Sequence, residues 1–173
     1  GKIFEGNKSA GAEIGHEVIR MGGEKCTCGR RGCFEAYASA TALINQAKRA
    51  MQKNQESLLW KFCANDIEKV DGKIVFDAKD AGDKAAEKVV KNYIRYLAEG
   101  VANLVNVFRP EAIVLGGGVC AQGDALIKPL KRKVNALAYG GVKYAPVEIL
   151  TASLGNDAGL CGAARLAMVK FKN

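Results

Sequence analysis

The sequence is poor in proline, histidine and aromatic residues, with three prolines and one histidine among 173 residues. It contains no apolar run of about 18 residues, so no membrane-spanning helix is predicted. No basic segment followed by an apolar stretch opens the chain, so no signal peptide is predicted. Apolar residues make up 49% of the chain, and glycine contributes 20 residues. This balance is typical of one compact α/β domain with tight turns, and it argues against a fibrous or disordered chain.

The charge is unbalanced, with a formal net charge of +8. A nucleic-acid partner is one interpretation of a basic chain, and a solvated basic surface is the other. The densest basic group is Lys128, Lys131, Arg132 and Lys133, near one predicted helix. No aromatic residues interleave with this group to stack on bases. We therefore favour a solvated surface and expect neither a nucleic-acid nor a membrane partner.

The six cysteines are unevenly spaced, and three of them fall between Cys26 and Cys33. The other three, Cys63, Cys120 and Cys161, stand alone in apolar or glycine-rich surroundings. A secreted protein held by disulfides is one interpretation of six cysteines. A cluster with isolated, buried thiols fits a reduced cytoplasmic protein with one metal site better.

A candidate metal knuckle lies within residues 13–35. Its four candidate ligands are His16, Cys26, Cys28 and Cys33. Three thiolates and one imidazole form a donor set common at structural zinc sites. Gly29 and Gly32 allow the chain to fold back tightly, so that Cys33 points inward. The alternative is three unrelated thiols and a core histidine, but His16 is the only histidine and lies one short loop from the cluster. We therefore expect a structural Zn²⁺ ion.

Hydrophobic periodicity predicts alternating helices and strands after the cysteine cluster. The expected order is a loop or short hairpin over 1–33, a helix over 34–53, a short helix near 58–64, a turn at Asp71-Gly72, a long helix that Asp80 or Asp83 caps and Pro110 ends, a strand over 112–115, a helix over 123–136, a strand over 147–152 and a helix over 157–170. From residue 83 onward this order predicts a parallel α/β layer. Ligands of such layers bind at the carboxyl ends of the strands.

Three motifs resemble those of one known family. The run Gly11-Ala12-Glu13-Ile14-Gly15-His16, followed by Cys26-x-Cys28-Gly29-x-x-Gly32-Cys33-x-Glu35, is similar to the signature of the ROK family of bacterial sugar kinases and sugar-responsive repressors. Gly116-Gly117-Gly118 and Gly155-Asn156-Asp157-Ala158-Gly159 look like later motifs of that family, and residues 35–43 look like its glucokinase branch. The resemblance covers essentially the whole chain. It implies an actin-like fold, with two ribonuclease-H-like domains around a cleft.

The resemblance implies binding roles for residues in two places. Glu13, His16 and Glu35 are expected to contact the sugar, with His16 also bound to zinc. Carboxylates suit a ring of hydroxyls because each accepts hydrogen bonds from two neighbouring hydroxyls, and a metal-bound imidazole has a fixed orientation. The glycine turn over 116–118 is expected to let a nucleotide approach the backbone closely. A merely structural glycine turn is the alternative.

The same resemblance implies that part of the kinase lies outside this sequence. Such kinases open with an Asp-x-Gly-x-Thr phosphate loop and carry their catalytic aspartate in an N-terminal Asn-Asp motif. Neither pattern occurs before residue 13, and the chain begins with Gly1. We therefore expect residues 1–173 to be the C-terminal sugar- and nucleotide-binding domain, without the N-terminal domain and its catalytic aspartate, and inactive alone.

The expected whole protein is a cytoplasmic, glycolytic glucokinase that uses ATP with Mg²⁺ to phosphorylate glucose or a related hexose. A homo-oligomer is the expected assembly. The sugar-sensing domain of a ROK-type transcriptional repressor is the alternative, because its DNA-binding segment would also lie upstream. An independent zinc-dependent module that binds nucleic acid is disfavoured by the scattered charge.

The last predicted helix carries a further expectation. In the family it crosses back toward the N-terminal domain. Its apolar residues are Leu160, Ala163, Ala164, Leu166, Ala167 and Val169. We expect these side chains to lack part of their cover in this chain. Exposed apolar surface of that kind favours displacement of the helix or self-association through it.

Overall fold

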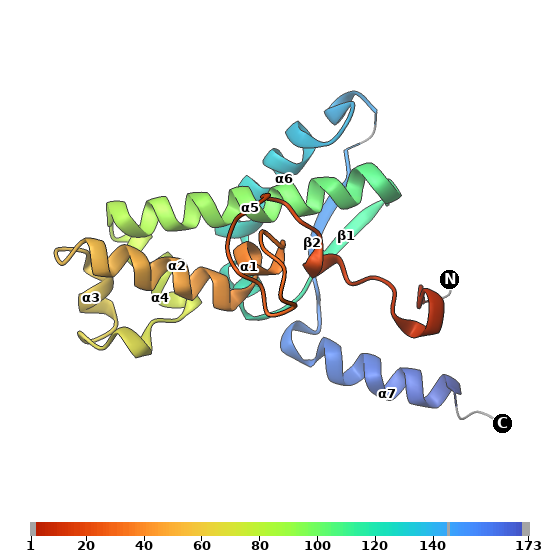
Figure 1. Cartoon of the computed structure of the whole chain (residues 1–173), viewed down its shortest axis with the longest axis horizontal. Helices are drawn as coiled ribbons and strands as arrows, with labels where there is room; N and C mark the ends of the chain where they lie inside the picture. Colours follow the sequence, from red (N-terminus) through yellow and green to blue (C-terminus); the bar gives the residue numbers. More distant parts are fainter. Residues whose placement is uncertain (1–2, 145, 171–173) are drawn as a thin grey trace.

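The computed structural model describes residues 3–144 and 146–170, which form an α/β domain (Figure 1). Its helices and strands are α1 Glu35–Ala38, α2 Ala40–Lys53, α3 Leu58–Phe62, α4 Gly72–Asp80, α5 Lys84–Phe108, β1 Ala112–Leu115, α6 Asp124–Leu137, β2 Glu148–Thr151 and α7 Ala158–Lys170. Short 3₁₀ turns lie between them, including η2 Ile14–His16, η4 Gly118–Gln122 and η6 Gly155–Asp157. The order of elements from α5 to α7 confirms the predicted alternation of helices and strands.

Helix α5 is the centre of the packing and runs through the middle of the molecule (Figure 1). Its apolar side chains recur every three or four residues, which places them along one side of the helix. Helices α1, α2, α4 and α6 all pack against it. The largest fully buried side chains that these and neighbouring helices contribute to the core are Leu43, Met51, Leu59, Phe76, Leu126 and Leu130. Burying each of these side chains stabilises the fold by about 1.5–3 kcal/mol relative to leaving it exposed. Because most of these helices pack on α5, this helix is the scaffold of the domain.

The two strands form a parallel pair, as predicted. The register runs from Ala112 opposite Glu148 to Leu115 opposite Thr151. Helix α6 connects the strands and packs on β2, and the Asn135 side chain of α6 accepts a hydrogen bond from the Val147 N–H at 3.2 Å. Because the strands are parallel, their carboxyl ends lie at one edge of the sheet, where η4 and η6 meet.

Two predicted elements are wrong in detail. The helix expected over 34–53 is interrupted at Ser39, which is extended and whose hydroxyl accepts from the Ala42 N–H at 3.1 Å. This is an N-cap, so α1 and α2 are separate helices. The turn expected at Asp71-Gly72 is instead the start of α4, because the Asp71 carboxylate caps it by accepting from the Ile74 N–H at 2.8 Å.

Of the two candidate caps for α5, the structure selects Asp83. One carboxylate oxygen accepts from the Ala86 N–H at 2.7 Å. The other accepts from the Ser57 hydroxyl at 2.8 Å and from the Leu58 N–H. Both Asp83 and Ser57 are buried, and Ser57 is the N-cap of α3. One carboxylate therefore joins the starts of two helices.

Helix α7 differs from the other helices because its described side chains are nearly all exposed. Leu160 is 74% exposed and Met168 is 61% exposed. In Figure 1 the helix extends away from the body of the domain. This exposure confirms that the apolar residues of the last helix lack cover within the chain. None of the helices in the described ranges is long and apolar enough to cross a membrane.

We predict that Asp83→Ala lowers the free energy of unfolding by about 2–4 kcal/mol, because it removes a helix cap and leaves the buried Ser57 hydroxyl without its acceptor. Asp71→Ala is the matched control, since it removes an exposed cap and is expected to cost only about 1 kcal/mol. Urea titrations of both variants at pH 7 measure the difference. Equal losses would contradict the role assigned to Asp83.

The same titrations have a predicted pH dependence. Burial raises the pKa of Asp83, but the hydrogen bonds from Ala86, Ser57 and Leu58 outweigh burial and hold its pKa below the usual value. A depressed pKa in the folded state means that the stabilisation is complete above the unfolded value of about 3.9 and is lost as pH falls through the folded value. The gap between the wild type and Asp83→Ala should therefore persist at pH 5 and shrink in stronger acid.

Helix α7 is predicted to exchange its amide hydrogens far faster than α5, by roughly 100-fold or more, because few buried contacts hold it. Hydrogen exchange with mass spectrometry on a dilute sample measures this. Protection that rises with protein concentration would mark self-association through the helix. Strong protection of α7 in a proven monomer would contradict the prediction.

Candidate functional site

The candidate knuckle is a small antiparallel arrangement that folds the chain back on itself. Val18 bridges to Cys33, and Lys25 bridges to Arg31. Gly29 and Gly32 have φ values of +88° and +87°, which are rare for residues with a side chain. The sequence prediction that these glycines permit a tight reversal is therefore confirmed.

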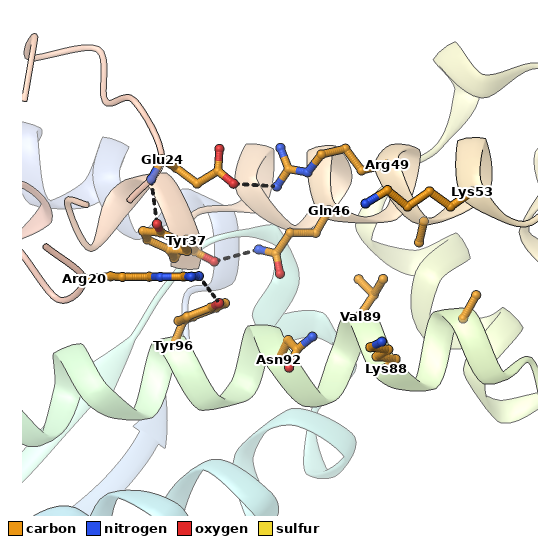
Figure 2. Close-up of a pocket in the computed structure, with 12 residues that line it drawn as sticks. Arg20, Glu24, Tyr37, Gln46, Arg49, Lys53, Lys88, Val89, Asn92 and Tyr96 are labelled. Carbon is orange, nitrogen blue, oxygen red and sulfur yellow. Dashed lines mark hydrogen bonds and ion pairs between the residues drawn. The ribbon is translucent and has the colours of Figure 1, made fainter. Parts of the chain in front are cut away.

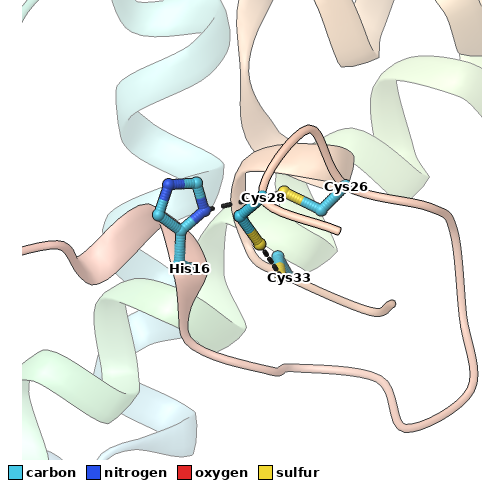
Figure 3. A group of neighbouring side chains, drawn as sticks. All are labelled: His16, Cys26, Cys28 and Cys33. Atoms are coloured by element: carbon cyan, nitrogen blue, oxygen red, sulfur yellow. Dashed lines mark hydrogen bonds between the residues drawn. The ribbon is translucent and has the colours of Figure 1, made fainter. Parts of the chain in front are cut away.

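The reversal brings the four predicted ligands together (Figure 3). The ligand atoms of His16, Cys26, Cys28 and Cys33 all lie within 4.8 Å of one another. The Cys28 and Cys33 sulfurs are 3.7 Å apart, and the Cys26 sulfur is 3.6 Å from His16 Nδ1. A tetrahedral ion with bonds of about 2.3 Å to sulfur and 2.0–2.1 Å to nitrogen requires separations of about 3.8 Å and 3.6 Å. The donor types and their spacing therefore fit Zn²⁺.

The thiols of this cluster differ in their surroundings and therefore in their pKa values. The Cys28 backbone N–H has the largest influence on Cys26 and lowers the pKa of its thiol to about 6. Burial, followed by interactions with Cys28 and Cys26, raises the pKa of the Cys33 thiol to about 11. Several thiolates this close repel one another, so a bound divalent cation is what allows all of them to be deprotonated together.

The His16 ring faces two ways. Nδ1 points to the thiols, and Nε2 lies 4.0 Å from a carboxylate oxygen of Glu13. A carboxylate oxygen of Glu35 lies 3.8 Å from Nδ1. The structure thus brings together all three residues that the sequence predicted for sugar binding. Two exposed carboxylates beside the imidazole can accept several hydrogen bonds from hydroxyl groups, and Nε2–H can donate one when Nδ1 binds a metal.

Packing against α5 fixes the position of this site. Glu35 begins α1, and the preceding Phe34 ring lies on the backbone of α5. A Cβ atom at Gly100 would lie 2.4 Å from that ring, which explains a glycine in the middle of a long helix. At the other end of α1, the Tyr93 hydroxyl donates to the Ala38 carbonyl at 3.0 Å. Burial raises the pKa of Tyr93 to about 12, so it remains a hydrogen-bond donor at neutral pH.

The predicted glycine turn follows β1 and lines a cavity of about 180 Å³. Gly117 has a φ of +96°, so the backbone conformation requires glycine there. Gly116 and Gly118 have no such φ, and a Cβ added at either would meet nothing within 4 Å. Neither packing nor conformation requires glycine at these two positions. Open space above a bare backbone favours close approach of a ligand.

Helix α1 links the two candidate sites. Glu35 at its start belongs to the group around His16, whereas Ala38 and Ser39 at its end line the cavity of the glycine turn. Four helical residues rise only about 6 Å along the axis. A small molecule bound at Glu35 is therefore close to a second ligand bound above the glycine turn.

Sequence reasoning missed two residues of this arrangement and misjudged one. Ser39 could have been recognised, since serine just before an apolar periodic run is a helix-start signal. The role of Tyr93 could not, because its partner Ala38 lies 55 residues away. Cys161 was expected to be buried, but it is exposed on α7, where the helix lacks packing partners.

The sequence is similar to one family of known proteins. The ROK family pattern matches residues 1–170. The chain is 42% identical to a glucokinase of Halalkalibacterium halodurans over 94% of this chain and 49% of that protein. It is 37% identical to a glucokinase of Thermotoga maritima over 96% of this chain and 52% of that protein. A xylose repressor of Bacillus spizizenii is 28% identical over 98% of this chain and 40% of that protein.

Solved structures give a consistent picture of the fold. A ROK family glucokinase from Streptomyces griseus in complex with glucose and AMPPNP has a TM-score of 0.88 and 32% identity, covering 97% of this chain and 55% of that chain. A ROK hexokinase from Thermus thermophilus has a TM-score of 0.79 and 32% identity, covering 99% of this chain and 52% of that chain. The chain thus spans about half the length of the glucokinases it matches.

We predict that the purified chain contains one metal ion per molecule, expected to be zinc. Cys28→Ser should weaken metal binding by more than about 100-fold, because it removes a ligand rather than a supporting contact. It should also lower the melting temperature, since metal binding contributes to folding. Cys161→Ser is the control, because Cys161 lies on α7 outside the cluster. Elemental analysis gives the metal content; a folded protein without metal would refute the site.

Proposed function

Because the chain belongs to the ROK family, we propose that it forms the sugar- and nucleotide-binding part of an ATP-dependent glucokinase that converts glucose to glucose 6-phosphate. The observation that carries the proposal is the convergence of Glu13 and Glu35 on His16, one short helix away from the glycine turn. The similarity to glucokinases at 37% and 42% identity supports glucose as the substrate.

In this proposal the sugar lies against Glu13, His16 and Glu35. Each carboxylate accepts hydrogen bonds from neighbouring hydroxyls, and such charge-assisted bonds are roughly twice as strong as neutral ones. His16, Cys26, Cys28 and Cys33 would hold a Zn²⁺ ion, which would supply structure rather than chemistry. The His16 imidazole would then have a fixed orientation, with Nε2–H available to donate to a sugar hydroxyl.

The nucleotide lies above the glycine turn over 116–118, at the carboxyl end of β1. We propose ATP with Mg²⁺ as the phosphate donor, consistent with the AMPPNP named for the Streptomyces griseus structure. Phosphoryl transfer depends mainly on positioning and charge stabilisation. The contribution of this chain is to hold the sugar and the nucleotide about one helix turn apart.

The base that takes the proton from the reacting hydroxyl is proposed to lie outside residues 1–173. In this view the chain is the C-terminal domain of an actin-like kinase, and an N-terminal domain supplies the catalytic aspartate. Glu13 and Glu35 are binding residues, because both lie against the imidazole that orients the sugar. We further propose that the whole protein is a cytoplasmic homo-oligomer.

A sugar-sensing role in a transcriptional repressor is the second candidate. It is supported by the similarity to a xylose repressor over 98% of this chain. The sugar site would then bind its ligand without any transfer of phosphate. Identity with the glucokinases is higher, at 37% and 42% against 28%, and favours the kinase.

The proposal is tested with the complete gene product and with the 173-residue chain, each given glucose and Mg-ATP in a coupled assay. The complete product should phosphorylate glucose. Glu35→Gln should lower its kcat/KM by about 10- to 100-fold, because one charge-assisted hydrogen bond is worth about 1.5–3 kcal/mol. The 173-residue chain alone should give no turnover above background, because it lacks the proposed base.

The matched control is Glu56→Gln, which neutralises an exposed carboxylate on the loop after α2 and should leave kcat/KM unchanged. Glucose binding by the complete product without any phosphorylation would support the repressor instead. Turnover by the 173-residue chain, free of host kinase, would show that the proposed division of labour is wrong.

A further inference from the structure

A second cavity lies between α2 and α5 and is closed at one end by the knuckle (Figure 2). Its volume is about 360 Å³, which is within the usual range for sites that bind small molecules. Its lining contains none of the residues assigned above to the metal, the sugar or the nucleotide. The proposed metal, sugar and nucleotide sites therefore do not account for this cavity.

Positive charge dominates the lining. Arg20 comes from the knuckle, Arg49 and Lys53 from α2, and Lys88 from α5. The one carboxylate in the lining belongs to Glu24, which lies 3.6 Å from the Arg49 guanidinium. The formal charge of these five groups is four positive and one negative, which leaves +3.

The two lysines of the cavity are free to bind a ligand. Within the described ranges, neither Lys53 nor Lys88 has an ion-pair or hydrogen-bond partner. By contrast, Lys48 pairs with Glu68 at 2.5 Å and Lys131 pairs with Glu148 at 2.6 Å. Unpaired cations from two helices that line one cavity are expected to attract a multiply charged anion.

The remaining lining also offers contacts to the organic part of a phosphate ester. Ala50, Ala85 and Val89 provide an apolar patch. The Tyr96 hydroxyl accepts from Arg20 at 3.3 Å and retains its own proton for donation, and the Asn92 amide also faces the cavity (Figure 2). Hydroxyl and amide groups next to unpaired cations match a phosphate ester with polar substituents.

We propose that this cavity binds a small phosphate-bearing metabolite, with the phosphate held by Lys53, Lys88 and the arginines at the rim. The shared chemistry is a phosphate dianion, which can come from a sugar phosphate or from free inorganic phosphate. The site is separate from the proposed kinase centre and does not depend on the proposed activity.

Isothermal titration of the metal-loaded chain in low-salt buffer without phosphate tests the site, with glucose 6-phosphate, inorganic phosphate and glucose as probes. Lys53→Met/Lys88→Met should weaken binding of the phosphate probes at least tenfold. Lys61→Met/Lys91→Met removes the same charge from exposed positions outside the cavity and should change the affinity less than twofold. Methionine keeps the apolar stem, and circular dichroism verifies the fold of each variant.

Glu35→Gln separates this site from the proposed sugar site. It should weaken glucose binding by about 10- to 100-fold and leave phosphate binding at the cavity within twofold of wild type. Tighter binding of glucose 6-phosphate than of phosphate identifies a sugar phosphate as the ligand, and equal binding identifies free phosphate; both support the cavity. Three results would overturn the proposal. The wild type could fail to bind phosphate, or the two double-lysine variants could lose equal phosphate affinity. Alternatively, Lys53→Met/Lys88→Met could change only the oligomeric state.

Discussion

In the proposed arrangement the His16 imidazole belongs to two sites at once, the metal cluster and the sugar site, and both depend on its orientation. Nδ1 is 3.6 Å from the Cys26 sulfur, and Nε2 is 4.0 Å from a Glu13 carboxylate oxygen. A histidine with one nitrogen on a metal has little freedom to rotate, so its second nitrogen becomes a fixed element of the neighbouring site. Arg30 strengthens the link, because its guanidinium donates to the His16 carbonyl at 3.2 Å. The knuckle is therefore, on this proposal, a part of the sugar site.

The helical scaffold transmits this constraint to the glycine turn. Helix α1 is only four residues long, and both of its ends are held, by the Phe34 ring against Gly100 and by Tyr93 on the Ala38 carbonyl. Because α5 supplies both contacts, the same rigid element positions the group around His16 and the cavity above the glycines. Precise spacing between two ligands is a main requirement of the proposed phosphoryl transfer.

The sequence was sufficient for features with a local signal. The Cys₃His donor set and its glycines predicted the cluster around His16, and apolar periodicity predicted α5 and the parallel strands. Prediction from the sequence failed where a local pattern fits two kinds of structure, or where the contacting residue is distant in the sequence. Asp71-Gly72 resembles a turn and a helix start equally, and tertiary packing of α4 decides between them. The cationic cavity joins Arg20 to Lys88 across 68 positions, and no local pattern predicts such a convergence.

The most direct measurement of the link between metal and ligand site is X-ray absorption at the zinc edge, with and without glucose. A shell of three sulfurs at about 2.3 Å and one nitrogen at about 2.0–2.1 Å is expected, since the ligands of the cluster are three thiolates and one imidazole. This shell should not change when glucose binds, because the proposed contact of His16 with the sugar uses its other nitrogen. A shell with four sulfurs, a shell of nitrogen and oxygen only, or an oxygen entering it with glucose would contradict the shared role of His16.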